Sequence, residues 1–260
     1  MTQDNLVINV DSLGFAYFSN MWIFRGCKVE ISKGSIYCIL GPNGCGKSTL
    51  LNLLLGILKP VEGTVKVKGI MGFVPQIFQV TFSFRALDMV LMGRARQIGF
   101  FGRPANSDLE KAWLAMDKMG IADLALRPFY ELSGGQRQLT ILARALVSEA
   151  EILVMDEPTS ALDLKNQSLV LDWLVRLSEE YGLTIVFTTH HPHHALAVAQ
   201  TVYLMMEGNF LEGLTEDVLT ETNLEKLYGL PIRRLEFEHN EKPVSALVPI
   251  LTPRILKNDH

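Results

Sequence analysis

The sequence predicts an α/β protein built around a parallel sheet, and three observations predict it. Short apolar runs at residues 35–40, 151–156 and 183–188 have the length and composition of strands that are buried on both faces. A glycine-rich turn follows the first run and leads directly into an apolar helical pattern. Another helical pattern, at residues 164–180, separates the other two runs. Strands that alternate with helices in this way are typical of a parallel sheet.

The rest of the chain is expected to add strands before this core and helices within it. Alternating apolar residues predict strands in the first 40 residues, and residues 61–74 resemble further short strands. Residues 85–148 carry several helical patterns, which predicts a helical insert. After Pro231 the chain is charge-rich and contains three further prolines, so we expect an extension that is not a long helix.

Composition and charge exclude several classes of protein. The chain has 260 residues, enough for one or two domains, and no apolar run reaches the roughly eighteen residues of a membrane helix. A formal net charge of −4 argues against a nucleic-acid partner bound by bulk positive charge. Cys27, Cys38 and Cys45 lack CxxC spacing, which favours a reducing compartment over disulfides or zinc. The N-terminal residues lack an export-signal pattern.

A phosphate-binding loop is predicted at residues 41–48, GPNGCGKS, which match GxxxxGK[ST] between a strand and a helix. Glycines let successive backbone N–H groups surround the β- and γ-phosphates at a helix N-terminus. Lys47 adds a point charge, and the Ser48 hydroxyl is suited to Mg²⁺. The alternative, an ordinary glycine turn that caps a helix, is disfavoured by this context.

Two carboxylates, Asp156 and Glu157, end the apolar run that starts at Ile152. We therefore expect both at the carboxyl edge of a parallel sheet, where ligands bind in α/β folds. Asp156 would hold Mg²⁺, and Glu157 would act as the general base for the attacking water. An acidic turn before Pro158 is the alternative, and the phosphate loop makes it the weaker one.

A second anion cradle is predicted where LSGGQ, residues 132–136, precedes a helical pattern. A simple N-cap would explain Ser133 but not the two glycines after it. With the phosphate loop upstream and Asp-Glu-Pro downstream, LSGGQ resembles the signature of ATP-binding-cassette (ABC) ATPases over about residues 5–230. The resemblance implies a P-loop NTPase cassette with a RecA-like parallel-sheet core, an antiparallel β segment and an inserted helical subdomain.

The resemblance also implies roles for individual residues. Tyr17 would stack on adenine, although an aromatic in the core is the alternative. Gln76 would reach Mg²⁺ and the attacking water, and His190 would contact the γ-phosphate. Ser160 to Asp163 would form a loop that crosses between subunits. The residues expected to bind ATP are Tyr17, Gly41, Pro42, Asn43, Gly44, Cys45, Gly46, Lys47, Ser48, Thr49, Ser133, Gly134, Gly135, Gln136 and Asp163; the catalytic residues are Glu157, His190 and Gln76; and the Mg²⁺ ligands are Ser48, Gln76 and Asp156.

Two other patterns have competing interpretations. The tract His190-His191-Pro192-His193-His194 has the composition of a metal cluster, but Pro192 interrupts helical spacing and the resemblance already gives His190 a role. Cys45 lies beside a helix N-terminus, which would lower the pKa of a reactive thiol. A small residue that is merely tolerated in the loop is the favoured interpretation.

Partners and organisation follow from the resemblance. Two copies would face each other, so that Ser133 of one completes the site of the other. The helical subdomain, 77–148, would be inserted between core segments 1–76 and 149–230, and 231–260 would form a C-terminal extension. The helical subdomain would dock an integral membrane permease, with a solute-binding protein as an indirect partner. This places the chain at the cytoplasmic face of the inner (cell) membrane as a peripheral subunit, with no nucleic acid bound.

The class of transporter is suggested by the stretch VLMGRARQIGFFGRPANSD, which resembles importers of metal chelates, cobalamin, haem and molybdate or tungstate. A short strand hairpin between Ser48 and Gln76 and the ALVPIL tail favour the molybdate/tungstate branch. An iron-siderophore, haem, cobalamin or zinc importer remains open. From other classes, a soluble iron–sulfur-assembly cassette ATPase and an export cassette remain open. A DNA-repair or translation cassette is disfavoured.

Overall fold

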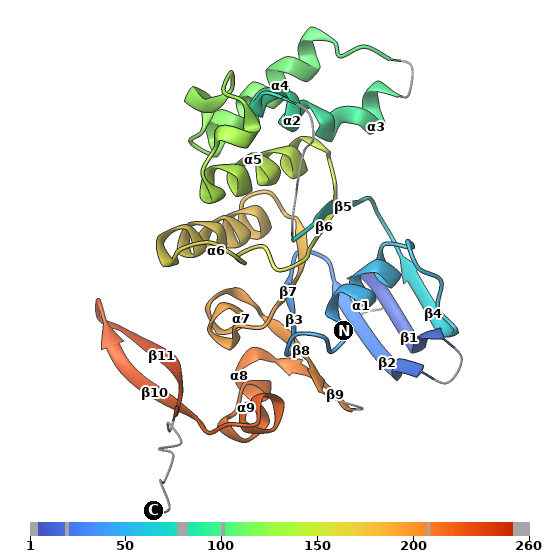
Figure 1. Cartoon of the computed structure of the whole chain (residues 1–260), viewed down its shortest axis with the longest axis vertical. Coiled ribbons are helices and arrows are strands. Elements are labelled where there is room, and N and C mark those ends of the chain that lie inside the picture. The colour runs from blue at the N-terminus through green and yellow to red at the C-terminus, as the bar shows by residue number, and fades with distance from the viewer. Residues whose placement is uncertain (1–4, 19–20, 77–82, 100–101, 207–208, 252–260) are drawn as a thin grey trace, which may run out of the picture.

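A six-stranded sheet forms the centre of the fold in this computed structural model (Figure 1), which describes residues 5–18, 21–76, 83–99, 102–206 and 209–251. The strand order is β5-β6-β7-β3-β8-β9, and all neighbours are parallel except β8 and β9. The apolar runs predicted as buried strands form β3, β6 and β7, and every residue in these three strands is buried. The strands are β5 (Met71–Val74), β6 (Ile152–Met155), β7 (Thr184–Thr189), β3 (Ile36–Leu40), β8 (Thr201–Met206) and β9 (Asn209–Leu214).

A three-stranded antiparallel sheet lies on one side of this centre. It consists of β2 (Met21–Ser32), β1 (Leu6–Phe18) and β4 (Glu62–Val67). Helix α1 (Lys47–Leu54) joins the two sheets, because its leucines share one apolar cluster with residues of β1 and β3, such as Ile8 and Ile39. The expected hairpin between Ser48 and Gln76 is wrong: β4 pairs with β1 and β5 pairs with β6, so the two strands belong to different sheets.

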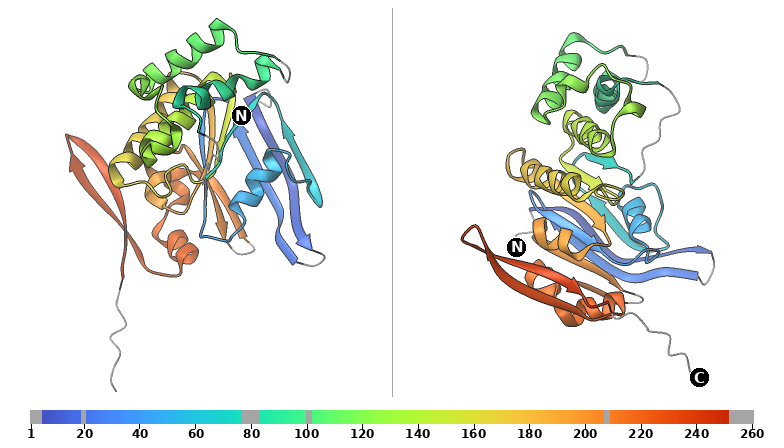
Figure 2. Two further views of the ribbon diagram at one scale, coloured as in Figure 1. Left: turned by 45° about the horizontal axis from the view of Figure 1, so that its top comes forward. Right: turned by 60° about the vertical axis from the view of Figure 1, so that its left-hand side comes forward.

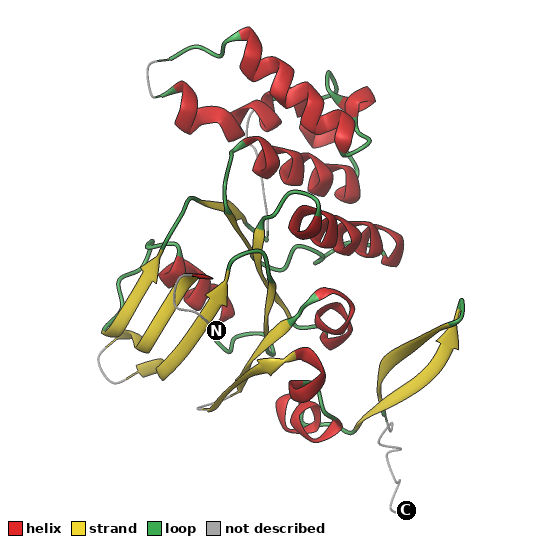
Figure 3. Cartoon of the chain, turned by 180° about the vertical axis from the view of Figure 1, so that it is seen from behind, coloured by secondary structure: helices red, strands yellow, loops and turns green. Residues whose placement is uncertain are grey.

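The predicted helical insert is present and lies at one end of the molecule, beyond the central sheet (Figure 1). One apolar cluster runs from its helices into the sheet, so that Met116 and Leu142 share a core with Met155 and Phe187. Figure 3, coloured by secondary structure, shows the helices and the antiparallel sheet as separate parts around the central strands. The insert contains α2 (Ala86–Leu91), the 3-10 turn η2 (Met92–Arg94), α3 (Ala95–Ile98), α4 (Asn106–Lys118), η3 (Ala122–Leu124), η4 (Phe129–Glu131) and α5 (Gly134–Val147).

The remaining helices follow the strands of the sheet, and a hairpin ends the described chain. These helices are α6 (Leu164–Glu179), α7 (Pro192–Val198), α8 (Thr215–Val218) and α9 (Glu221–Tyr228). The hairpin pairs β10 (Ile232–His239) with β11 (Lys242–Pro249) and projects beside α7 and α9 (Figures 1 and 2). The segment after Pro231 is therefore no long helix, as expected. Pro243 and Pro249 lie near the ends of β11, and Pro253 lies outside the described residues.

Among the residues that the structure describes, no helix combines the length and the apolar character that a membrane crossing requires. The boundary expected between residues 76 and 77 adjoins 77–82, which lie outside the described residues, as do residues 252–260 of the expected extension.

Candidate functional site

The loop between β3 and α1 has a backbone that only glycine fits at two positions. Gly46 has φ +104°, a left-handed conformation that is unfavourable for residues with a Cβ. A Cβ on Gly41 would lie 2.6 Å from Cys45 Sγ and 2.8 Å from Met205 O, so β8 leaves no space for one. The glycines thus keep the loop tight against the sheet, with Ser48 and Thr49 in the first turn of α1.

The Lys47 side chain lies inside this loop and is hydrogen-bonded to its backbone. Its side chain is nearly buried, and Nζ donates to Gly41 O at 2.9 Å and to Pro42 O at 3.1 Å. The ammonium group is therefore held under the loop, where it faces any anion bound to the N-terminus of α1.

A cavity of about 680 Å³ opens over the loop, a size typical of cofactor and ligand sites. Its wall combines the antiparallel sheet, the loop and the segments that follow β5, β6 and β7. The lining residues are Tyr17, Ile23, Asn43, Gly44, Gly46, Lys47, Ser48, Thr49, Gln76, Glu157, Ser160, Ala161 and His190. Gly41, Pro42, Cys45 and Asp156 were predicted to belong to the site but are not part of this wall.

Glu157 is the centre of the contacts inside the cavity. Its Oε1 lies 3.3 Å from Lys47 Nζ. Its Oε2 accepts a hydrogen bond from Gln76 Nε2 at 3.3 Å and lies 3.1 Å from His190 Nδ1. Gln76, Glu157 and His190 follow β5, β6 and β7, which are neighbours in the sheet. Parallel pairing therefore brings together three predicted residues that are far apart in the sequence.

The backbone of Glu157 adopts an unusual conformation. Its φ is +45°, a region that costs a residue with a side chain on the order of 1–3 kcal/mol. Thr188 on β7 supports it: Glu157 N donates to Thr188 Oγ1 at 2.9 Å, and the same hydroxyl donates to Asp156 Oδ1 at 2.6 Å. No motif marks Thr188, which is one of three threonines in β7 (Thr184–Thr189) and has no local signal that sets it apart from the other two.

The donor groups fit Mg²⁺. A hydroxyl at Ser48, a carboxylate at Asp156 and an amide at Gln76 are the hard oxygen ligands that this ion prefers. Ser48 and Gln76 line the cavity. Asp156 lies beside it, and Oδ1 accepts the Thr188 hydroxyl, which orients the carboxylate.

Tyr17 lies on the cavity wall and not in the core, so the alternative interpretation of this aromatic is wrong. Its side chain is 53% exposed, and the hydroxyl is 3.1 Å from Thr49 Oγ1. The ring contacts Phe15 edge-on at a centroid distance of 4.9 Å, which fixes its orientation. One face is therefore available for a planar ligand.

The LSGGQ segment lies apart from the cavity of its own chain. Ser133 caps α5 in a capping box: Gln136 N donates to Ser133 Oγ, and Ser133 N donates to Gln136 Oε1. Packing also requires a glycine at position 135, because a Cβ there would lie 2.1 Å from Asn166 Oδ1 at the start of α6. Asp163 caps α6 by accepting from Asn166 N at 2.8 Å. The predicted residues Ser133 to Gln136 and Asp163 thus adjoin one another.

The two competing interpretations lose support. No group of three or more His, Cys, Asp or Glu side chains within the described ranges is arranged to hold a metal ion. His194 is instead buried with both ring nitrogens engaged by neighbours. Burial raises the pKa of the Cys45 thiol, and the nearby Lys47 charge only partly opposes this. The alternative of a lowered pKa at Cys45, which the sequence disfavoured, is therefore wrong.

Comparisons with known proteins agree with this geometry. The family model described as "ABC transporter" matches residues 24–160. Molybdate import ATP-binding protein MolC of Haemophilus influenzae is 43% identical over 95% of this chain and 97% of its own length. A probable iron chelatin transport ATP-binding protein of Helicobacter pylori is 34% identical, with coverages of 93% and 100%. A putative metal-chelate type ABC transporter in an inward-facing conformation has a chain that matches with a TM-score of 0.91 at 43% identity, covering 95% of this chain and 98% of that one.

Proposed function

Because the chain belongs to the ABC transporter ATP-binding family, we propose that it hydrolyses ATP between two copies of itself to drive a membrane permease that imports a metal complex or metal oxyanion. The predicted fold class is confirmed, and so is the prediction of an ATPase. One observation carries the assignment of the site: Lys47, Gln76 and His190 converge on Glu157 in a cavity over the phosphate loop.

Different residues of the site bind the phosphates, the adenine and Mg²⁺ in this proposal. Backbone N–H groups of the loop surround the phosphates, and Lys47 Nζ lies under them as a point charge. Tyr17 would stack on the adenine, and Ser48, Gln76 and Asp156 would hold Mg²⁺. When bound, Mg²⁺ supplies positive charge that polarises the terminal phosphate.

Glu157 acts as the general base. Its ion pair with Lys47 gives way when a phosphate takes the place of the carboxylate next to Nζ, which leaves the carboxylate to accept a proton from the attacking water. Gln76 and His190 already contact Oε2 and hold the carboxylate and the water in line with the phosphate.

A second copy completes the site. The N-terminus of α5 and Asp163 adjoin each other but do not line the cavity of their own chain. In a symmetric dimer, Ser133 to Gln136 of the partner copy would cover the open side of the cavity. This arrangement gives a role to the N-terminus of α5 and to the open side of the cavity. The division into a core (1–76 and 149–230), a helical subdomain (77–148) and an extension (231–260) belongs to this proposal. The apolar core shared between helices and sheet supports coupling between the first two parts.

The transported solute is proposed from kinship. The 43% identity to a molybdate import protein favours molybdate or tungstate, and the 34% identity to an iron chelatin protein keeps an iron chelate as the alternative. The permease would dock on the helical subdomain, and a solute-binding protein would deliver the solute to it. This arrangement places the chain at the cytoplasmic face of the membrane.

Phosphate release from ATP by the purified chain tests the enzymatic part. We expect a specific activity that rises with protein concentration, because two copies form the site, and an Asp156→Asn variant that has lost it. A chain without ATPase activity at any concentration would overturn the proposal. Uptake into vesicles that hold the chain together with its permease, with molybdate, tungstate and a ferric chelate compared, tests the solute.

A further inference from the structure

His194 occupies a buried position that the proposed mechanism does not use. It lies in the first turns of α7, close to His190 in sequence, and only 2% of the residue is exposed. A buried imidazole needs partners at both ring nitrogens, or it costs a desolvated polar atom. The identity of these partners therefore shows what the residue holds together.

Both ring nitrogens of His194 are engaged, and by different segments. Nδ1 lies 3.1 Å from Thr159 Oγ1 and 3.5 Å from Thr189 Oγ1. Nε2 lies 3.3 Å from Gln167 Oε1 on α6. Gln167 Nε2 in turn donates to Leu162 O at 3.0 Å.

These contacts are consistent with a single protonation state of the ring. Gln167 Oε1 only accepts, so Nε2 of His194 carries the proton and donates. Nδ1 is then the acceptor, and the Thr159 hydroxyl donates to it. Burial lowers the pKa of His194 to about 3, so the ring is neutral at pH 7 and remains an acceptor at Nδ1.

Two of the three segments that meet at His194 carry residues of the proposed site, and the third is α6. Thr159 and Leu162 belong to the loop that begins at Glu157 and ends at Asp163, which faces the second copy. Thr189 precedes His190, and its hydroxyl also accepts from His191 N at 3.1 Å. Hydrogen bonds through one rigid ring therefore connect the loop that contains Glu157 with the loop that contains His190.

We propose that His194 is a positioning residue that fixes the 157–163 loop to the 189–191 segment, so that Glu157 and His190 are held in register when the second copy contacts Asp163. This inference rests on the proposed function. It assigns to His194 a role in turnover and none in nucleotide binding, because His194 is not among the residues that line the cavity.

Four variants of the full chain test this role. His194→Leu keeps similar volume and removes both hydrogen bonds. His194→Gln offers an amide that can accept from Thr159 and donate to Gln167. Thr159→Val removes only the donor to Nδ1. His193→Leu is the control, because this neighbouring histidine is classed as exposed, has no side-chain hydrogen bond among the described contacts and meets the His194 ring only edge-on, at a centroid distance of 4.5 Å.

We expect His194→Leu to lower kcat for ATP by about 10- to 100-fold, since a shift of about 1 Å in reacting groups has an effect of this size. KM for ATP should stay within about twofold, because no group that binds ATP is changed. Thr159→Val should lower kcat in the same direction by a smaller factor. His194→Gln should recover most of the lost kcat, and His193→Leu should match the wild type.

A kcat for His194→Leu within about twofold of the wild type would overturn the inference. So would a loss of ATP affinity that accompanies the loss of kcat and that His194→Gln does not restore, since that result indicates a purely structural residue. A wild-type chain that fails to hydrolyse ATP contradicts the proposed function instead, so the two failures are distinguishable.

Discussion

Lys47 Nζ and Glu157 Oε1 lie 3.3 Å apart, with side chains that are only 6% and 10% exposed. Mutual attraction offsets only part of what both charges lose in hydration, and removing either partner would leave an unpaired buried charge. A nucleotide phosphate offers Lys47 a replacement for the carboxylate. The pair therefore holds both side chains in place before ATP binds, and it links occupancy of the phosphate loop to release of the general base.

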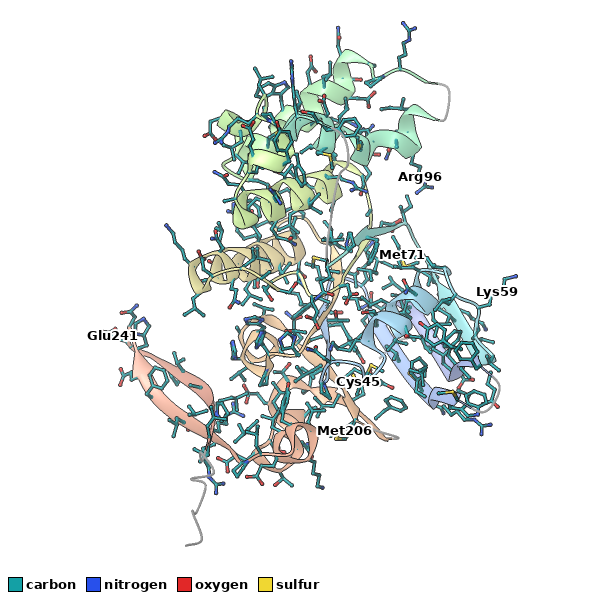
Figure 4. All side chains as sticks on the ribbon, in the orientation of Figure 1. Cys45, Lys59, Met71, Arg96, Met206 and Glu241 are labelled. Atoms are coloured by element: carbon teal, nitrogen blue, oxygen red, sulfur yellow. The ribbon has the colours of Figure 1, made fainter. Side chains whose placement is uncertain are left out.

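Replacing the lysine tests this link. Lys47→Ala removes the charge under the phosphates and two hydrogen bonds to the loop carbonyls. We expect the Kd for ATP to rise about tenfold or more, since charge-assisted contacts are worth upwards of ~1.4 kcal/mol. Titration of a fluorescent ATP analogue measures it. Lys59→Ala is the control, because Lys59 is exposed, lies in the segment between α1 and β4, and points outward from the molecule (Figure 4). Equal affinities for the two variants would contradict the role of Lys47.

If Tyr17 stacks on the adenine, its ring should contribute to ATP binding and its hydroxyl should not. Tyr17→Ala should raise KM for ATP roughly 5- to 100-fold, which corresponds to the ~1–3 kcal/mol of one base stacked on an aromatic ring. Tyr17→Phe should stay close to the wild type, since it loses only the contact to Thr49. Phe18→Ala provides the control at an adjacent position that is 73% exposed. Steady-state kinetics with ATP decide, and an unchanged KM in Tyr17→Ala would refute stacking.

The two glycines after Ser133 are expected to differ in their tolerance of a methyl group. Gly135→Ala places Cβ against Asn166 Oδ1 and should cost about 1–3 kcal/mol of unfolding free energy through overpacking. Gly134→Ala meets only the end of the flexible Leu162 side chain, at 3.3 Å, and should be nearly neutral. Urea unfolding followed by circular dichroism compares them. If both variants unfolded at the same urea concentration, the packing argument would fail.

The raised pKa of Cys45 predicts that its thiol reacts slowly with alkylating reagents. Thiolate is the reactive form, so a pKa above the usual range means less thiolate at any given pH and slower alkylation. At pH 8 the native chain should react with iodoacetamide at Cys45 more slowly than the urea-unfolded chain does, and the difference should shrink at higher pH. Peptide mass spectrometry separates Cys45 from Cys27 and Cys38. Equal rates in the two states would show that burial does not protect the thiol.

Local sequence patterns predicted the strands and the helix whose signal lies within one short stretch of the chain. The apolar runs of β3, β6 and β7 and the helix after the glycine loop are where the sequence places them, because burial on both faces leaves a continuous apolar signature. Strand pairing depends on distant residues. The region around β4 and β5 therefore resembles a hairpin in sequence, although its strands pair in different sheets. Leu235 and Phe237 alternate with glutamates in β10, but both are exposed and the stretch is charge-rich, so it does not resemble a strand that packs against a core.

The site residues divide in the same way into those that the sequence identifies and those that tertiary packing alone brings into contact. The phosphate-loop motif and the acidic pair after a strand identified Lys47 and Glu157, and the family resemblance identified Gln76 and His190. The supporting contacts are set by tertiary packing, and no motif marks them. Examples are the Thr188 hydroxyl under Glu157, Asn166 against Gly135, and His194 between Thr159 and Gln167.

The central claim, that ATP is bound and hydrolysed between two copies of the chain, is tested most directly by sedimentation of a Glu157→Gln variant. This change removes the general base and should slow turnover by about 10²–10⁴-fold while ATP still binds. We expect a monomer without nucleotide, a dimer with ATP, and a monomer again when Ser133→Arg is added to obstruct the α5 N-terminus. A Glu157→Gln chain that binds ATP and remains a monomer, or a dimer that is unaffected by Ser133→Arg, would contradict it.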